Sequence, residues 1–292
     1  MDFVLPVVSR ACRLAEGPLW HPEQARLYWT DIPDGKIYGY HPALGKHECY
    51  YSGKPVGGFT FNRNASMVLF RMKDVCWIDF HKNIRAVQRV ALPGMQRFND
   101  VIAAPDGSVF AGTVGCTEKS GGLYHFKTDG TVCRIFSGTG CANGMGFSPD
   151  QAIFYWTCST TRKIYAYEYK DGQVRVASNR VIYHAPPEEG IPDGMAVDRE
   201  GNIWSARWDG FQLIKISPSG EKLDSFSLPR ARITSVCFGG PQLDRFYITA
   251  AAVDVPEANA DQCLFEGKRN AVCGQEEFFS ALDPSRQFRI ID

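Results

Sequence analysis

Four polar residues that could bind a metal stand at the start of short apolar segments lying far apart in the chain. They are Glu16, Asn99, Asn143 and Asp193, and three of them directly precede a Gly. Carboxylate and amide oxygens are the ligands that hard divalent cations such as Ca²⁺, Mg²⁺ and Mn²⁺ prefer. No His stands at these positions, which disfavours a His-rich zinc site. Each residue alone can equally be a turn residue, because Asn-Gly and Asp-Gly are common turn signals.

The segments that follow these residues share one pattern, which recurs along the chain. Residues 191–206 illustrate it: a polar residue before a Gly, a short apolar strand, a polar turn and a second apolar strand. The turn markers recur roughly every 40 to 50 residues, at Pro22, Asn62, Pro105, Pro149, Asp198 and Gly240. This is the period of a four-stranded propeller blade.

Six such units predict an all-β fold, a single six-bladed β-propeller domain over residues 1–292 with four strands in each blade. The apolar segment 3–8 precedes the first unit, and we expect this N-terminal strand to complete the last blade and close the ring. The pattern is unclear from 253 to 274, where a helical turn at 257–262 is compatible with the sequence. It resumes at 278–282 and 288–291.

The first strand of each blade in a propeller lines the central channel, so the leading residues of the units should meet at the channel mouth. Units two and six offer Gly57 and Thr234 there and contribute no carboxylate. Arg97 lies two residues before Asn99 and therefore shares its face of the strand. A guanidinium beside a metal suits an anionic or oxygen-rich small molecule.

The composition disfavours several classes of protein. Lys and Arg number 32, as do Asp and Glu, so no basic excess indicates a nucleic-acid partner. The N-terminus has no signal-peptide pattern, and no segment is apolar enough to span a membrane. The ten Cys form no Cys-x-x-Cys pair and mostly lie in apolar runs. We therefore expect a cytoplasmic protein with reduced thiols.

Five short motifs resemble the signatures of the SMP-30/gluconolactonase/luciferin-regenerating enzyme family. In chain order they are residues 14–20 (LAEGPLW), 97–100 (RFND), 143–144 (NG), 191–195 (IPDGM) and 237–240 (CFGG). They follow the family's order and spacing over about residues 12 to 250. The resemblance implies a six-bladed β-propeller with one catalytic divalent metal in its central channel, and a hydrolase that opens sugar lactones to aldonic acids.

The resemblance also assigns roles to individual residues. Glu16, Asn143 and Asp193 match the family's metal ligands. An oxygen-and-amide site of this kind accepts Ca²⁺, Zn²⁺, Mn²⁺ or Fe²⁺, so the sequence does not select the metal. Asp193 is in addition our candidate catalytic base, because a carboxylate near the metal can take the proton as water attacks.

Three further residues match substrate-contacting positions of the family. Arg97 and Asn99 match the substrate-binding pair, and Glu118 falls near another such position in a loop, 115–121, that aligns loosely. The expected partner is a small sugar lactone, which places the protein in carbohydrate metabolism, and the expected assembly is a monomer or a weak homo-oligomer. Two alternatives stay open: a related hydrolase or isomerase acting on another cyclic ester, and a non-catalytic propeller that binds calcium.

Two features depart from the family pattern. Cys158 occupies a position after the second strand of unit four where an Asp is common, and Asp31 is the equivalent in unit one. We expect Cys158 to be a buried thiol, because no basic residue neighbours it in the sequence. In the last unit, residues 263–267 and 278–282 compete as the third strand.

Overall fold

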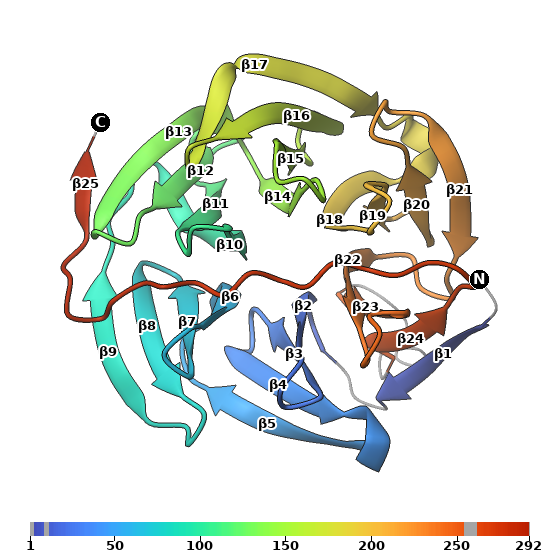
Figure 1. Ribbon diagram of the computed structural model, residues 1–292, viewed down its shortest axis with the longest axis horizontal. Helices are drawn as coiled ribbons and strands as arrows, with labels where there is room; N and C mark the ends of the chain where they lie inside the picture. Colours follow the sequence, from blue (N-terminus) through green and yellow to red (C-terminus); the bar gives the residue numbers. More distant parts are fainter. Residues whose placement is uncertain (1–2, 9–11, 254–261, 292) are drawn as a thin grey trace.

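The computed structural model describes residues 3–8, 12–253 and 262–291. Its strands form six sheets arranged as blades around a central channel (Figure 1), which confirms the predicted all-β, six-bladed propeller. Apart from strands, the described residues include two short 3₁₀ segments, η1 (Pro42–Leu44) and η2 (Pro187–Glu189). The described part of the chain has no helix that could cross a membrane.

The first three blades follow one another along the chain. Blade one contains β2 (Ala15–His21), β3 (Arg26–Asp31), β4 (Lys36–His41) and β5 (Lys46–Ser52). Blade two contains β6 (Val56–Asn62), β7 (Ser66–Arg71), β8 (Asp74–Asp79) and β9 (Ile84–Arg89). Blade three contains β10 (Met95–Ala103), β11 (Val109–Gly115), β12 (Gly121–Phe126) and β13 (Thr131–Thr139), with β25 (Arg289–Ile291) as a fifth strand.

The other three blades complete the ring. Blade four contains β14 (Ala142–Phe147), β15 (Ile153–Cys158), β16 (Lys163–Lys170) and β17 (Gln173–His184). Blade five contains β18 (Ile191–Val197), β19 (Ile203–Trp208), β20 (Gln212–Ile216) and β21 (Lys222–Ser227). Blade six contains β22 (Ile233–Gly239), β23 (Arg245–Ala250), β24 (Leu264–Lys268) and, from the other end of the chain, β1 (Phe3–Val8).

The ring closes as the sequence predicts. Strand β1 pairs antiparallel with β24, from Phe3 opposite Lys268 to Val8 opposite Leu264. Blade six therefore takes three strands from one end of the chain and one from the other. Because the two ends share one sheet, blade six is complete only when the ring is closed.

Residues 269–288, which we call the C-terminal strap, run across the ring from blade six toward blade three (Figure 1). The backbone nitrogen of Arg199 donates to the Cys273 carbonyl (2.9 Å), and that of Ala281 donates to the Gly107 carbonyl (2.7 Å). The third strand of blade six is β24, close to the 263–267 alternative. The expected strand at 278–282 is wrong, since this segment makes one isolated bridge, from Ser280 to Asn62. Most of the suggested helical turn at 257–262 lies outside the described residues.

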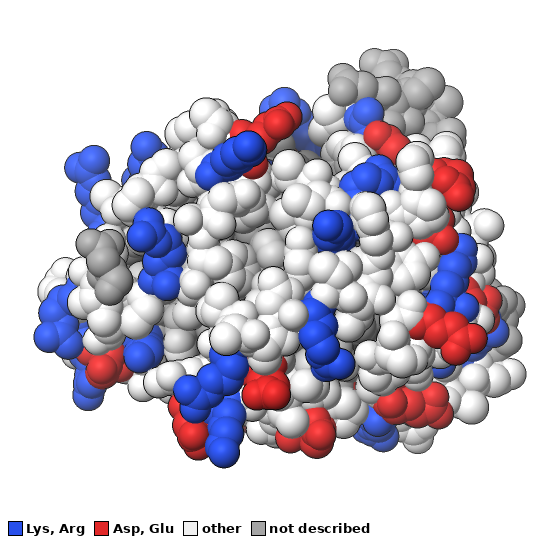
Figure 2. Space-filling view, turned by 90° about the horizontal axis from the view of Figure 1, so that it is seen from above, with Lys and Arg blue, Asp and Glu red and all other residues white. Residues whose placement is uncertain are grey.

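Neighbouring blades pack through large aromatic side chains. Trp204 of blade five lies 4.6 Å, centroid to centroid, from Phe246 of blade six. Phe70 of blade two lies 5.1 Å from Phe126 of blade three. These contacts fix the angle between adjacent sheets and so the shape of the channel. The outer face seen in Figure 2 carries basic and acidic side chains interspersed, in line with the equal numbers of each.

Candidate active site

The inner strand of every blade loses its regular pairing at one equivalent position. The register shifts between Glu16 and Leu19, Phe98 and Val101, Ala142 and Met145, Pro192 and Met195, Val56 and Gly58, and Ile233 and Ser235. A shift of this kind frees a side chain from strict alternation and re-aims it. The four polar residues predicted to share a site all lie at these shifts: Glu16, Asn143 and Asp193 within the first three residues of their strands, and Asn99 in the middle of β10.

Glycines beside the polar residues let the inner strands come close together. A Cβ at Gly144 would lie 2.6 Å from the Asp193 carbonyl oxygen, and one at Gly194 would lie 2.2 Å from Ser235 Oγ. Both distances are too short for a side chain, so these positions require Gly. The close approach brings the leading residues of neighbouring blades within reach of one another.

A chain of hydrogen bonds joins blades three, four and five at the mouth. Arg97 donates from a guanidinium nitrogen to Asn99 Oδ1 (2.5 Å). Asn99 Nδ2 donates to Asn143 Oδ1 (2.5 Å), and Asn143 Nδ2 donates to Ser159 Oγ (2.8 Å). The Ser159 hydroxyl in turn donates to the Pro192 carbonyl (2.6 Å), one residue before Asp193. The network holds both amides in fixed orientations.

Three carboxyl groups share the channel beside Arg97. Burial raises the pKa of Glu16 well above its usual range, and the neighbouring Asp193 and Asp100 raise it further. Burial and Asp100 do the same for the pKa of Asp193. The pKa of Asp100 rises to about 7, also because of burial, with Arg97 opposing the shift. The cluster therefore carries unbalanced negative charge when ionised, and a cation would relieve it.

The residues present fit a divalent cation. Glu16 and Asp193 are both about 95% buried, and Asp193 Oδ1 has no hydrogen-bond partner among the described residues. The described residues contain no group of three or more His, Cys, Asp and Glu placed to hold a metal. The third ligand would therefore be the Asn143 amide oxygen, which keeps a free lone pair beside its bond to Asn99. Two carboxylates and an amide form a hard donor set.

Cys158 does not reach this site. Its thiol is 2% exposed and shares a hydrogen bond with Thr139 Oγ1 (3.1 Å), so the buried-thiol interpretation is correct. In blade one, the equivalent Asp31 accepts from the backbone nitrogens of Arg13 and Leu14 (both 3.1 Å), just before Glu16.

In blade four, Thr160 takes over part of the task that Asp31 performs in blade one. Its hydroxyl oxygen accepts from the backbone nitrogen of Cys141 (3.0 Å), two residues before Asn143. The support of the ligand strand therefore survives the replacement of an Asp by Cys158.

Glu118 lies on an exposed loop beside the mouth. A Cβ at Gly140 would lie 3.0 Å from the Cα of Glu118, so the loop packs against the segment that leads to Asn143. No contact of the Glu118 carboxylate joins it to the other site residues in the described structure. Its role in substrate binding stays a prediction.

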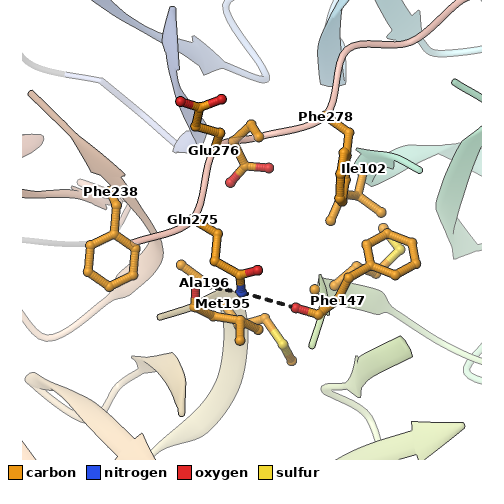
Figure 3. A pocket seen from close by; sticks show the side chains of 12 residues that line it. Ile102, Phe147, Met195, Ala196, Phe238, Gln275, Glu276 and Phe278 are labelled. Carbon is orange, nitrogen blue, oxygen red and sulfur yellow. Dashed lines mark hydrogen bonds between the residues drawn. The ribbon is translucent and has the colours of Figure 1, made fainter. Parts of the chain in front are cut away.

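The opposite end of the channel is closed by the strap. Gln275 Nε2 donates to the carbonyls of Phe147 (3.3 Å) and Val197 (3.4 Å), where two inner strands end (Figure 3). A cavity of about 50 Å³ lies beside the strap, and its lining includes Asp100 and Glu277. The strap therefore covers this end of the channel.

Sequence reasoning missed three residues that the fold brings to the site. Ser159 fixes the Asn143 amide, and Cys141 Sγ lies 3.6 Å from the side-chain nitrogens of both Asn99 and Asn143. Asp100 adds a third carboxyl. Cys141 stands two residues before Asn143, as Arg97 does before Asn99, so the alternation of the repeat could have found it. Asp100 belongs to the 97–100 motif but received no role there, and nothing local marks Ser159.

The sequence was compared with known families and proteins. Residues 14–252 match the family model described as the SMP-30/Gluconolactonase/LRE-like region. The chain is 40% identical over 255 residues to pentonolactonase XacC of Haloferax volcanii, covering 86% of each protein. It is 31% identical over 271 residues to regucalcin of Danio rerio, covering 89% of this chain and 92% of the relative.

Solved structures share the fold. A luciferin-regenerating enzyme superposes with a TM-score of 0.83 at 24% identity, covering 94% of this chain and 97% of the other. A calcium-binding protein, regucalcin, from Agrobacterium tumefaciens superposes with a TM-score of 0.85 at 22% identity, covering 94% and 96%. At these identities the structures support the propeller architecture alone.

Proposed function

This chain belongs to the SMP-30/Gluconolactonase/LRE-like family, and on that premise we propose that it hydrolyses a sugar lactone to the corresponding aldonic acid with the help of a divalent metal ion. The relative at 40% identity is named a pentonolactonase, which favours a five-carbon aldonolactone as the first substrate to test.

One observation carries the proposal. The buried oxygen Asp193 Oδ1, which lacks a hydrogen-bond partner among the described residues, lies in the same channel as Glu16 and beside the Arg97–Asn99–Asn143 network. A propeller that serves only as a scaffold has no use for such a costly arrangement of buried charge. The arrangement suits a metal with a polyhydroxylated ligand bound next to it.

Glu16, Asn143 and Asp193 would hold the ion. When bound, a divalent ion supplies Lewis acidity that stabilises the oxyanion formed when water attacks an ester carbonyl. Mn²⁺, Fe²⁺, Zn²⁺ and Ca²⁺ are all compatible with this donor set.

Asp193 would act as the general base. Its Oδ1 lacks a hydrogen-bond partner among the described residues and is free to face a water molecule. The water oxygen bonds to the lactone carbonyl carbon while Asp193 takes its proton. The ring carbon–oxygen bond then breaks, and the leaving alkoxide regains that proton to give the hydroxy acid.

Arg97 and Asn99 would position the sugar. Arg97 is half-buried at the mouth, and its guanidinium keeps donors that its bonds to Asn99 and the Phe98 carbonyl do not use. Such donors suit the ring hydroxyls of an aldonolactone. Fixing the sugar at several hydroxyls places its carbonyl next to the base.

The test is a panel of five- and six-membered aldonolactones, assayed by acid release after chelator treatment and after adding back Ca²⁺, Mn²⁺, Zn²⁺ or Fe²⁺. We expect turnover that chelator abolishes and one or more of these ions restore. The absence of turnover on every lactone in protein shown to bind the ion would refute the proposal and leave a non-catalytic metal-binding propeller.

Two matched pairs of variants test the site itself. Asp193→Asn should lower kcat at least 100-fold, since a general base contributes about 10²- to 10⁴-fold; Asp171→Asn, at a side chain 74% exposed, should be neutral. Glu16→Gln should weaken metal binding, whereas Glu23→Gln on the exposed turn of the same blade should not. Full activity in Asp193→Asn would remove this residue from the mechanism.

A further inference from the structure

Two cysteines from opposite ends of the chain meet where the ring closes. Cys12 lies just before the first strand of blade one, and Cys263 lies just before β24 of blade six. They are 251 residues apart in the sequence, yet their sulfurs are 3.1 Å apart, with the Cys263 thiol donating to Cys12 Sγ. Both side chains are fully buried.

The backbone on both sides of the thiols is held in place. Leu14 forms a bridge with Ala251, and the backbone nitrogen of Ala252 donates to the Arg13 carbonyl (3.2 Å). The backbone nitrogen of Ala250 donates to the carbonyl of Cys263 itself (3.0 Å). The proximity of the two sulfurs is therefore set by secondary structure on each side.

No other pair of thiols lies within hydrogen-bonding distance among the described residues. Two of the three remaining buried cysteines contact other groups: Cys76 a backbone carbonyl, and Cys158 the Thr139 hydroxyl. All ten cysteines are free thiols in the structure. The contact between Cys12 and Cys263 is thus particular to the point where β1 and β24 join the two chain ends.

We propose that Cys12 and Cys263 are a site of disulfide formation that closes the propeller ring covalently. A disulfide has a sulfur–sulfur distance of about 2.05 Å, so the sulfurs must approach by about 1 Å. The proposal goes beyond lactone hydrolysis, because no contact joins either thiol to Glu16, Asn143 or Asp193 in the described structure.

The reaction requires an oxidant, for which a small-molecule disulfide such as oxidised glutathione suffices. The thiolate of one cysteine attacks the oxidant and releases one glutathione thiolate, leaving a mixed disulfide. The second cysteine, as a thiolate, attacks the protein sulfur and releases the other glutathione. The protein loses two protons and two electrons, and the oxidant gains them as two thiols.

Burial dictates when this exchange happens. The hydrogen bond from Cys263, together with burial, holds the pKa of the Cys12 thiol far above its usual range, so the thiolate is rare in the closed ring. No oxidant can reach a fully buried sulfur directly. The bond therefore forms while the ring is closing during folding, and once formed it is shielded from reductants.

The bond would constrain the unfolded chain strongly, because the loop it closes contains almost the whole propeller. Disulfides of this kind shift the unfolding equilibrium by about 30- to 1000-fold toward the folded state. The effect should appear as a melting temperature that is higher without reductant than with it.

The experiment refolds the full chain from reduced, denatured protein in a glutathione redox buffer and in reductant alone. Free thiols are then alkylated under denaturing conditions and the peptides are mapped by mass spectrometry. We expect a cross-linked peptide pair containing Cys12 and Cys263 after refolding in the redox buffer, and quantitative alkylation of both after refolding in reductant. Quantitative alkylation of both residues in the redox-buffer sample, in soluble folded protein, overturns the proposal.

Variants separate this bond from the chemistry of the exposed thiols. Cys12→Ala and Cys263→Ala should each abolish the dependence of the melting temperature on reductant, while Cys49→Ala and Cys116→Ala, at exposed cysteines, should keep it. Lactonase activity should be unchanged in Cys263→Ala. If the alanine variants fail to fold, the peptide map of the wild-type protein still decides the question.

Discussion

Glu277 offers a quantitative test of how the channel is built. The strap carries its part-exposed carboxyl to the small cavity that also borders Asp100. Burial raises the pKa of Glu277 from 4.5 to about 7. The folded protein therefore binds a proton that the unfolded chain releases between these two pH values.

The sign of the effect on stability follows from this difference in protonation. Because the folded state holds the proton more tightly, the free energy of unfolding is highest below pH 4.5 as far as this group is concerned, and it falls as pH rises through 7. The loss amounts to about 3 kcal/mol, at 1.36 kcal/mol for each unit of pKa. Glu277→Gln removes the ionisable group and keeps the size of the side chain.

Urea unfolding at 25 °C between pH 5 and pH 8.5 measures the effect. The variant and the wild type should have similar stability at pH 5, and the variant should be about 2–3 kcal/mol more stable at pH 8.5. Glu276→Gln, at an exposed neighbour on the same strap, should follow the wild-type profile. Parallel profiles for Glu277→Gln and the wild type would show that the carboxyl is solvated and that the strap does not seal the channel.

Three further predictions concern the site and the strap. At pH 8, adding Ca²⁺ or Mn²⁺ should raise the melting temperature, because an ion relieves repulsion within the carboxyl cluster. At a hundredfold excess of ion over Kd, the free energy of unfolding should rise by about 2.7 kcal/mol. An unchanged melting temperature argues against a metal site. Ser159→Ala should weaken metal binding about 10- to 100-fold in a calorimetric titration, because it frees the Asn143 amide, while the exposed control Ser225→Ala should have no effect. Phe288→Ala should lower the free energy of unfolding in urea by about 1–2 kcal/mol, because the stacking on Trp77 is lost. The control Ile290→Ala, at a side chain that is 43% exposed, should change it little.

Local pattern was sufficient for the architecture. The strand-turn-strand repeat and its period depend on neighbouring residues in the chain, so the sequence predicted six blades and the spare N-terminal strand. The polar leading residues were found by comparing the equivalent position of the six units, since only four units carry a carboxylate or amide there. Glu16, Asn99, Asn143 and Asp193 all occupy the shifted position of an inner strand.

The supporting residues could not be predicted, because their partners are distant in the sequence and unrelated to the repeat. Ser159 bonds to Asn143 from the turn that follows the next strand. Thr160, in the same turn, holds the segment before Asn143, where an Asp does so in blade one. The strap looked like an incomplete strand because its backbone partners are the ends of inner strands in other blades. Its polar residue Glu277 gains an unusual pKa only once the channel encloses it.

The sequence by itself determined the repeat, the ring and the chemical character of the mouth, since each depends on residue type and spacing along one strand. Only the tertiary structure decided which side chains support the ligands, what seals the channel and which two of ten cysteines touch. The physical reason is that closure of the ring brings together positions about 250 residues apart. A periodic pattern in the sequence does not predict such a long-range contact, because the contact depends on the geometry of all six blades together.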